Sequence, residues 1–229
     1  MGDPEIVFLI PAYRAAATLG PLIERLKVLH PGIPVLVVDD GSKDNTAAVA
    51  RDAGAQVETL SVNRGKGTAL ASGLARLFKG GATWAICLDS DGQHLPEDVA
   101  AFLEHKTSDR CGIVVGAREL RPRSMPWARV CSNRLTTFLL GLQAGTRLWD
   151  SQCGFRMYRL AAFSEAKLPP QGRFEWESEA LVRVARAGWT IEKVRVSTVY
   201  TDAGSHIRPW RDTARFIKLW FRMWAWILG

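Results

Sequence analysis

Short apolar runs alternate with longer amphipathic stretches along the first half of the chain, a pattern typical of strands that alternate with helices. The predicted strands are short and mostly apolar: 5–10, 35–39, 56–60, 84–88 and 112–115. The predicted helices lie between them: 18–29, the stretch from the turn at 40–42 to 53, 65–79 and 96–106. This order predicts an α/β fold with a mostly parallel sheet covered by helices, whose ligands bind at the carboxyl ends of the strands.

Proline, glycine and capping residues mark the predicted boundaries. Pro11 is expected to end the first strand, and Thr18 is a candidate N-cap for the first helix. Gly54 and Gly116 are expected to end the second helix and the fifth strand. A further helix with an acidic first turn is expected over 175–187.

The composition fits one globular domain with an appendage. The chain has 229 residues, of which 47% are hydrophobic, and it has no uncharged apolar run long enough to span a bilayer. Its first residues lack the basic region and apolar core of a secretion signal, so a cytoplasmic location is expected. The cysteines have no metal-ligand spacing and are expected to be reduced core residues: Cys87, Cys111, Cys131 and Cys153.

The last segment of the chain, 208–229, carries much of the net charge of +7. Its basic residues recur at steps of three or four and would form one stripe on a helix: Arg208, Arg211, Arg215, Lys218 and Arg222. Trp220, Trp224 and Ile227 are among the apolar residues that fill the remaining surface. A basic, tryptophan-rich amphipathic helix is expected to lie in a membrane interface, with those three side chains in the lipid.

We therefore predict a main globular domain of 1–207 and a terminal amphipathic helix of 208–229 that binds peripherally at the inner face of the membrane. The alternative is a terminal helix that packs its apolar side on the domain. No nucleic-acid recognition motif accompanies the charge, so nucleic acid is not an expected partner.

Two carboxylates follow the strand predicted at 84–88. Asp89 and Asp91 are two residues apart, so their side chains point to the same side of an extended chain. Two hard oxygen ligands at the end of a central strand suit Mg²⁺ or Mn²⁺ that carries a phosphate substrate. Solvated turn aspartates are the alternative explanation, but the acidic strand end and the glycine-rich segment upstream favour a metal site.

Three predicted strand ends carry residues suited to hold a nucleotide donor. They are Pro11, Ala12 and Tyr13 after the first strand, Asp39 and Asp40 after the second, and Asp89 and Ser90 after the fourth. Asp39 and Asp40 would accept hydrogen bonds from ribose hydroxyls or a base edge, or else would cap a turn. The segment 63–67 offers backbone amides and Lys66 near a helix start, where a phosphate or base would bind. It matches neither a Walker loop nor a dinucleotide fingerprint.

Several blocks of the chain resemble the signature of family 2 glycosyltransferases, beginning with Val-Val-Asp-Asp-Gly-Ser at 37–42. Other blocks resemble the polyprenyl-phosphate (dolichyl-phosphate) mannose and glucose synthase branch: 63–67, 89–94, 116–118, 132–134 and 150–156. The resemblance covers roughly residues 5–210. It implies an A-type glycosyltransferase fold, inversion at the sugar carbon, a GDP- or UDP-sugar donor and a divalent cation.

The resemblance also implies roles for single residues. Asp89, Asp91 and Gln93 would hold the metal, and Asp91 is thereby a catalytic candidate. Candidates for the acceptor phosphate are Arg118, Arg134 and Arg208. A phosphate monoester is largely ionised at pH 7, its second pKa being about 6, so such an acceptor needs no general base. We expect transfer of a hexose to a polyprenyl phosphate or another lipid-linked acceptor.

A hydroxyl acceptor would need a general base. In hydroxyl-directed relatives the base lies in an acidic pair near this position, and Glu177 matches it best, with Glu179 as the alternative. Transfer to a lipid or glycan hydroxyl with Glu177 as base is therefore the second hypothesis, and a non-catalytic nucleotide-sugar-binding protein is the third. One block departs from the family: Arg14-Ala15 stands where Asn-Glu is common, which leaves the donor base open.

Overall fold

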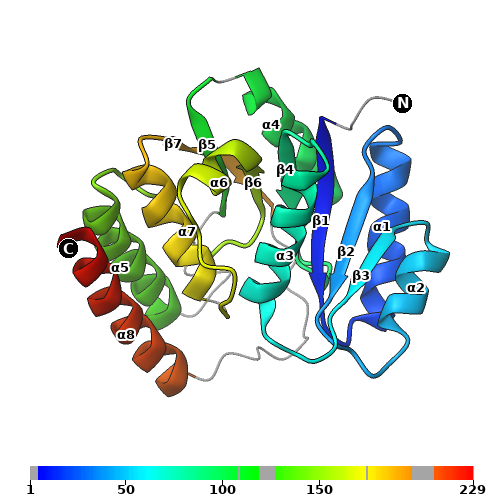
Figure 1. The fold of residues 1–229 in the computed structure, drawn as a ribbon, viewed down its shortest axis with the longest axis horizontal. Helices are drawn as coiled ribbons and strands as arrows, with labels where there is room; N and C mark the ends of the chain where they lie inside the picture. The colour runs from blue at the N-terminus through cyan, green and yellow to red at the C-terminus, as the bar shows by residue number, and fades with distance from the viewer. Residues whose placement is uncertain (1–4, 108, 119–126, 174, 198–208, 229) are drawn as a thin grey trace.

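A computed structural model describes residues 5–107, 109–118, 127–173, 175–197 and 209–228, without the side chains of 106–107, 128–129 and 209–216. Its strands form one sheet of seven, in the order β3-β2-β1-β4-β6-β5-β7 (Figure 1). The strands are β1 (Ile6–Ala12), β2 (Val35–Asp39), β3 (Gln56–Thr59), β4 (Trp84–Cys87), β5 (Cys111–Arg118), β6 (Arg156–Arg159) and β7 (Thr190–Val196). The predicted α/β class is confirmed.

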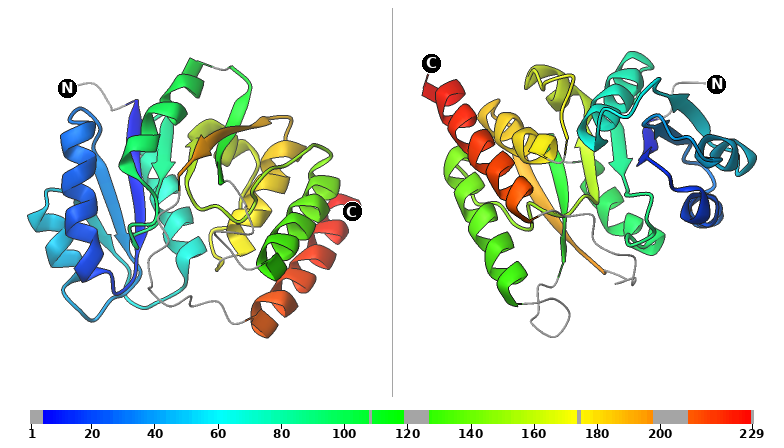
Figure 2. Two further views of the ribbon diagram at one scale, coloured as in Figure 1. Left: turned by 180° about the vertical axis from the view of Figure 1, so that it is seen from behind. Right: turned by 90° about the horizontal axis from the view of Figure 1, so that it is seen from below.

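The helices pack on both faces of this sheet (Figures 1 and 2). They are α1 (Ala16–Leu29), α2 (Thr46–Asp52), α3 (Lys66–Lys79), α4 (Val99–Leu103), α5 (Trp127–Ala144), α6 (Leu160–Glu165), α7 (Glu175–Arg186) and α8 (Pro209–Leu228). The helix predicted at 96–106 is shorter than expected, because its two ends are 3₁₀ turns, Pro96–Asp98 and Glu104–Thr107.

Two apolar cores lie on opposite faces of the sheet because successive side chains of a strand alternate. In β1, Val7 and Leu9 join the core under α3, α6 and α7, whereas Phe8 and Ile10 join the core under α1 and α4. Both faces are therefore covered, which explains why the central strands are apolar throughout rather than alternating.

The sheet is parallel except at β6, which is antiparallel to β4 and β5. β6 was not predicted, because its four residues, Arg156–Arg159, include two arginines and lack an apolar run. β2 and β4 lie on opposite sides of β1, so the strand order reverses there. Crevices at such reversals are the usual ligand sites of open α/β sheets.

Pro11 lies inside β1, which corrects the predicted boundary. The carbonyl of Ala12 accepts a hydrogen bond from the Asp40 N–H on the β2 side, so Pro11, one residue earlier, faces β4. β4 pairs with β1 only as far as Leu9. The missing N–H of Pro11 therefore interrupts no ladder.

Two other boundaries also differ from the prediction. α1 begins at Ala16 with Ala15 as its N-cap, because the Thr18 hydroxyl is used elsewhere: it donates to the Ser90 carbonyl at 2.6 Å. β5 continues past Gly116 to Arg118, because it pairs with β7 over that whole length. Both differences arise from partners that are distant in sequence.

α8 packs against α5 and α7 at one end of the molecule (Figures 1 and 2). Leu219 and Met223 are buried in the core that α7 shares, and the Gln143 amide donates to the Trp220 carbonyl at 2.9 Å. Ile227, which we assigned to the lipid, packs against this core instead. The predicted helix is confirmed, but part of its apolar surface covers the protein. In the described part of the chain, no helix combines the length and the apolar character needed to cross a bilayer.

Three of the cysteines are buried as expected: Cys87, Cys111 and Cys153. Burial raises the pKa of the Cys111 and Cys153 thiols to about 12. The expectation that Cys131 is also a core residue was wrong, since it lies on the outward face of α5 and is exposed.

Candidate active site

A half-buried lysine joins two carboxylates from different parts of the chain at the carboxyl edge of the sheet. Lys66, the first residue of α3, places its ammonium 2.6 Å from Asp89 Oδ1 and 2.9 Å from Glu177 Oε2. Asp89 follows β4, and Glu177 lies in the first turn of α7. The structure thus brings together a predicted donor residue, a predicted metal ligand and the predicted general base.

The electrostatics of this cluster favour its charged forms. Burial opposes ionisation of Asp89, but the nearby Lys66 ammonium prevails and holds the pKa of this carboxyl down at about 2. Burial likewise opposes the charge on Lys66, but Asp89 and Glu177 raise its pKa above the ordinary value. Gly154 lines the cluster: a Cβ there would lie 2.7 Å from Lys66 Nζ and 2.8 Å from Asp89 Oδ2. A side chain at this position would therefore displace the Lys66 ammonium or the Asp89 carboxylate.

The segment after Asp89 forms a tight turn. The Gln93 N–H donates to Asp91 Oδ1 at 3.0 Å, and the Asp89 N–H donates to His94 Nδ1 at 3.1 Å. The His94 ring stacks on Phe155, with centroids 5.0 Å apart. Burial lowers the pKa of His94, which favours the neutral ring that this hydrogen bond requires.

The predicted metal ligands offer two carboxylates and one amide oxygen: Asp89, Asp91 and Gln93. Within the described ranges, no group of three His, Cys, Asp or Glu side chains is arranged to hold a metal by itself. Mg²⁺ in phosphate-transfer sites is commonly bound by one or two carboxylates together with substrate phosphates. The residues present suit a cation of that kind.

The end of β2 is a braced turn. Asp40 accepts hydrogen bonds from the Arg64 and Gly65 N–H groups, both at 2.7 Å, so it holds the turn that leads into α3. Asp39 Oδ1 accepts from the Ser42 N–H at 3.1 Å. Capping, the alternative to donor contact, is thus present at both aspartates, and their contact with a donor stays a prediction.

The remaining donor candidates lie at the ends of β1 and β4. Pro11 and Ala12 are buried, and Tyr13 is 43% exposed. The Arg14 guanidinium lies 5.3 Å from the centroid of the Tyr13 ring. The Ser90 carbonyl is occupied by Thr18, as described above. Arg14, which stands where the family commonly has Asn, therefore lies over an exposed ring just after β1.

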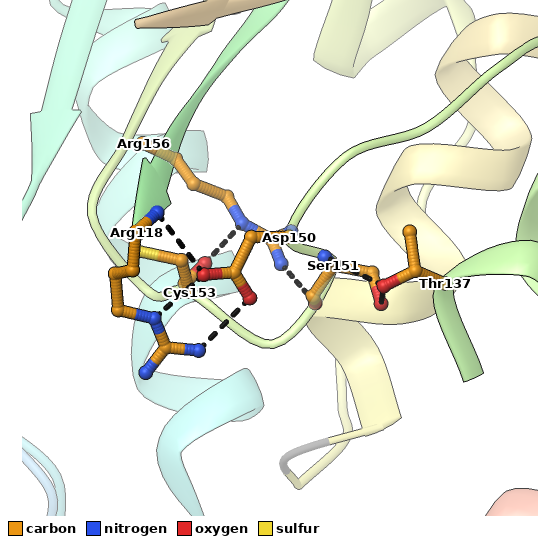
Figure 3. A network of polar contacts seen from close by, with 6 residues as sticks. All are labelled: Arg118, Thr137, Asp150, Ser151, Cys153 and Arg156. Carbon is orange, nitrogen blue, oxygen red and sulfur yellow. Dashed lines mark hydrogen bonds and ion pairs between the residues drawn. The ribbon is translucent and has the colours of Figure 1, made fainter. Parts of the chain in front are cut away.

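A polar network fixes the segment 150–156, which joins α5 to β6 (Figure 3). Asp150 accepts two hydrogen bonds from the Arg118 guanidinium, from Nε at 2.6 Å and from Nη2 at 2.9 Å. The fully buried Arg156 donates to the carbonyls of Ser151 and Cys153, each at 2.8 Å. It also donates to the Glu177 carbonyl at 2.6 Å, so it joins this segment to α7.

Arg156→Met should destabilise the fold strongly. The substitution leaves three buried carbonyls without their donor, which should cost about 3 kcal/mol or more in the free energy of unfolding. Urea unfolding curves would measure this cost. Arg76→Met, which removes an exposed arginine with contacts of 3.4 Å, is the matched control and should cost less than about 1 kcal/mol. An equally small loss for Arg156→Met would contradict the assigned role.

A groove of about 1020 Å³ lies between α5, the loop 145–150 and β7. Its cationic lining residues are Arg118, Arg134, Arg147, Lys193 and Arg195, and its large apolar ones are Phe138, Leu142, Leu148 and Trp149. The structure therefore brings the predicted pair Arg118 and Arg134 into one groove. The third predicted arginine, Arg208, lies outside the described residues.

Sequence reasoning missed three of these cations: Arg147, Lys193 and Arg195. Lys193 and Arg195 occupy alternate, exposed positions of β7, and this alternation was the available signal. The Lys193 ammonium lies 4.9 Å from the centroid of the Trp149 ring, which holds both side chains at the groove.

The two candidate bases in α7 have different environments. Glu177 contacts Lys66, as described, whereas Glu179 is buried and accepts from Arg183 at 2.8 Å and from Arg222 of α8. Glu179 therefore joins α7 to α8, and Glu177 is the glutamate that reaches the cluster. Arg222 is correspondingly not free for the basic stripe in which we placed it, although its side chain is 55% exposed.

Comparison with known proteins gives a consistent result. The model of the family described as "Glycosyl transferase family 2" matches residues 7–166. The chain is 29% identical over 223 residues to a UDP-N-acetylglucosamine–dolichyl-phosphate N-acetylglucosaminyltransferase of Methanococcus voltae, covering 88% of each chain. It is 28% identical over 211 residues to an undecaprenyl-phosphate mannosyltransferase of Micrococcus luteus, covering 87% of this chain and 85% of the relative.

Solved structures match the fold. A glucosyl-3-phosphoglycerate synthase of Mycobacterium tuberculosis, in complex with Mg²⁺ and uridine diphosphate, superposes with a TM-score of 0.72 at 19% identity. The match covers 96% of this chain and 79% of that one. The arrangement of strands and helices predicted for an A-type glycosyltransferase is therefore confirmed.

Proposed function

The chain belongs to glycosyl transferase family 2, and we propose that this glycosyltransferase moves a hexose from a GDP- or UDP-sugar to a polyprenyl phosphate, with inversion at the sugar carbon. The observation that carries the proposal is the position of segment 150–156. Through Gly154 it borders the Lys66–Asp89–Glu177 cluster, and through Asp150 it holds Arg118 at the cationic groove. One short segment thus joins a site suited to a nucleotide diphosphate to a groove suited to a lipid phosphate.

The donor binds, in this proposal, at the crevice between β1, β2 and β4. Asp39 and Tyr13 face its nucleoside, and Lys66 faces its diphosphate. Asp89, Asp91 and Gln93 would hold a divalent cation, which would supply positive charge to neutralise the departing diphosphate. The Mg²⁺ and uridine diphosphate named for the structural neighbour support this arrangement.

The acceptor phosphate binds Arg118 and Arg134 at the groove. An oxygen of the ionised phosphate attacks the anomeric carbon, a new C–O bond forms, and the bond from that carbon to the diphosphate breaks. No proton has to be removed from the nucleophile, so the step needs no general base. The dolichyl- and undecaprenyl-phosphate named for two relatives support this acceptor class.

Transfer assays with purified protein test the proposal. Radiolabelled GDP- and UDP-sugars, Mn²⁺ and polyprenyl phosphate are expected to give a labelled product that enters the organic phase. The matched control is the dephosphorylated polyprenol, which should accept nothing. Transfer to the polyprenol instead would favour a hydroxyl acceptor, and donor binding without any transfer would overturn the proposal.

We further propose that the enzyme contacts a membrane surface through α8 and the adjacent α5. Large apolar side chains are exposed on both helices: Trp127, Leu135, Phe138 and Leu142 on α5, and Ile217, Phe221, Trp226 and Leu228 on α8. Lys218 is exposed beside Ile217. Interfacial helices combine such apolar side chains with basic ones that attract anionic lipid.

Ile217→Ser with Phe221→Ser should weaken binding to vesicles of phosphatidylglycerol and phosphatidylcholine by about tenfold or more. Each exposed apolar side chain contributes roughly 1.5 kcal/mol or more when it leaves water. Flotation assays measure the bound fraction, and thermal melting checks the fold. Val28→Ser with Phe78→Ser removes exposed apolar side chains from α1 and α3 and should leave flotation unchanged. Equal flotation of both double variants would contradict the membrane contact.

The second candidate function is transfer to a lipid or glycan hydroxyl. The contact between Glu177 and the Lys66–Asp89 pair favours it, because a carboxylate beside the donor site is where a general base would be needed. The two functions make opposite demands on Glu177, so the activity of a Glu177→Gln variant separates them.

A further inference from the structure

We propose that Lys66 competes with the divalent cation for Asp89 and moves to the donor diphosphate when nucleotide binds. Metal and nucleotide would then bind cooperatively. This inference rests on the proposed function, because it assumes that Asp89 helps to hold a divalent cation.

The position of Lys66 is unusual for its local structure. It is the first residue of α3, where the partial positive charge of a helix N-terminus disfavours a cation. Its ammonium is nevertheless held by Asp89 and Glu177, and its side chain is only 17% exposed. The attraction of the two carboxylates therefore outweighs the unfavourable helix end. The position of the Lys66 ammonium is thus set by the site and not by the helix.

The contact with Asp89 is built into the neighbouring segment. A Cβ on Gly154 would lie 2.7 Å from Lys66 Nζ and 3.0 Å from Asp89 Oδ1, the oxygen that Lys66 contacts. The backbone at this position thus leaves just enough room for the ion pair. A divalent cation that bonds to the same oxygen has to displace the ammonium or share the carboxylate with it.

A diphosphate changes this competition. Its oxygens add negative charge beside Lys66, and an ammonium carries donors that can turn toward phosphate. Once Lys66 moves to the diphosphate, Asp89 is released for the metal. The metal alone should therefore bind weakly, and the diphosphate should strengthen its binding.

Equilibrium dialysis of Mn²⁺ tests this inference with and without inorganic pyrophosphate, because the protein-bound metal is the excess over the protein-free chamber, which also contains the Mn²⁺–pyrophosphate complex. Pyrophosphate is used because it needs no knowledge of the donor base. The wild-type protein should bind Mn²⁺ at least tenfold more tightly when pyrophosphate is present. Lys66→Met should bind Mn²⁺ about tenfold more tightly than the wild type without pyrophosphate, because one unit charge a few ångströms from the metal is gone. Pyrophosphate should then add little.

Three further variants control for destabilisation of the fold, for the presence of a cation at position 66 and for net charge. Lys66→Gln retains a hydrogen-bond donor without the charge and should bind Mn²⁺ as Lys66→Met does. It replaces Lys66→Met in the test if Lys66→Met has a lower melting temperature than the wild type. Lys66→Arg retains the cation and should keep the weak binding of the wild type. Arg173→Met removes an exposed cation near Gly65 and should leave the Mn²⁺ affinity unchanged within about twofold, which controls for net charge.

The outcomes distinguish this inference from the proposed function. Suppose that the wild type binds Mn²⁺ in the presence of pyrophosphate. If Lys66→Met and Lys66→Gln, measured without pyrophosphate, bind Mn²⁺ no more tightly than the wild type under the same condition, the inference is wrong, but the metal site of the proposed function is supported. If no variant binds Mn²⁺ under either condition, the inference and the metal requirement of the proposed function both fail. If Arg173→Met increased the Mn²⁺ affinity as much as Lys66→Met does, the effect would come from net charge alone, and the inference would be wrong.

Discussion

Asp91→Ala should reduce sugar transfer by roughly a thousandfold or more, which corresponds to about 4 kcal/mol of activation free energy. The expected cause is loss of the cation that neutralises the departing diphosphate. Asp91 is the cleanest site for this test, because it is exposed and its described hydrogen bond comes from the adjacent Gln93 N–H. Its removal should leave the fold intact. Asp89→Ala should be equally damaging but would also release Lys66.

Two measurements separate a metal effect from a structural one. Mn²⁺ binding in the presence of pyrophosphate should be lost in Asp91→Ala, and the melting temperature should stay close to that of the wild type. Asp52→Ala, at an exposed position of α2, is the matched control and should keep full activity. Transfer that survives in excess EDTA, or an Asp91→Ala enzyme with nearly normal turnover, would reject the metal assignment.

The sequence predicted the parallel strands β1 to β5 but not the parallel strand β7. A central parallel strand is recognisable because it is apolar on both faces and ends in a turn that local residues define. β2, β4 and α3 lie within a residue or two of their predicted bounds. β6 could not be predicted, because its buried Arg156 is stabilised by carbonyls of 151, 153 and 177 rather than by an apolar pattern. The true end of β5 depends on β7, which is distant in sequence.

The candidate site shows a similar division. The residue types at a strand end indicated Asp89 and Asp91, whereas Arg118 and Arg134 were indicated only by the resemblance of their sequence blocks to the family. The Lys66–Glu177 contact could not be predicted, since it joins two helix starts that only the folded sheet brings together. Likewise, both Glu177 and Glu179 fitted the sequence as candidate bases. The ion pair of Glu177 with Lys66 and those of Glu179 with Arg183 and Arg222 distinguish them.

Replacement of Arg118 and of Glu177 should identify the acceptor class. If the acceptor is a phosphate, Arg118→Ala should lower kcat/KM for polyprenyl phosphate by about a hundredfold, because a charge-assisted hydrogen bond contributes roughly 1.5–3 kcal/mol. Glu177→Gln should then retain most activity. If the acceptor is a hydroxyl, the order reverses, because the general base becomes essential.

Loss of fold stability has to be separated from loss of acceptor binding in this comparison. Arg118 is paired with the buried Asp150, so Arg118→Ala also leaves a buried carboxylate without its partner and should lower the melting temperature. Arg134 lines the same groove but is exposed, so Arg134→Ala tests the acceptor phosphate with little cost to the fold. Arg51→Ala on α2 is the matched control for loss of an exposed arginine.

The decisive measurement is the kinetics of all four variants with polyprenyl phosphate and with polyprenol as acceptors. For a phosphate acceptor, Arg118→Ala and Arg134→Ala should both lose activity, whereas Glu177→Gln and Arg51→Ala should retain it. Glu177→Gln keeps an oxygen that can still accept a hydrogen bond from Lys66, so loss of activity in this variant would point to the carboxylate as a base. If the two arginine variants and Glu177→Gln were all as active as the wild type, the acceptor would have to bind elsewhere than in this groove, and both acceptor hypotheses would be wrong.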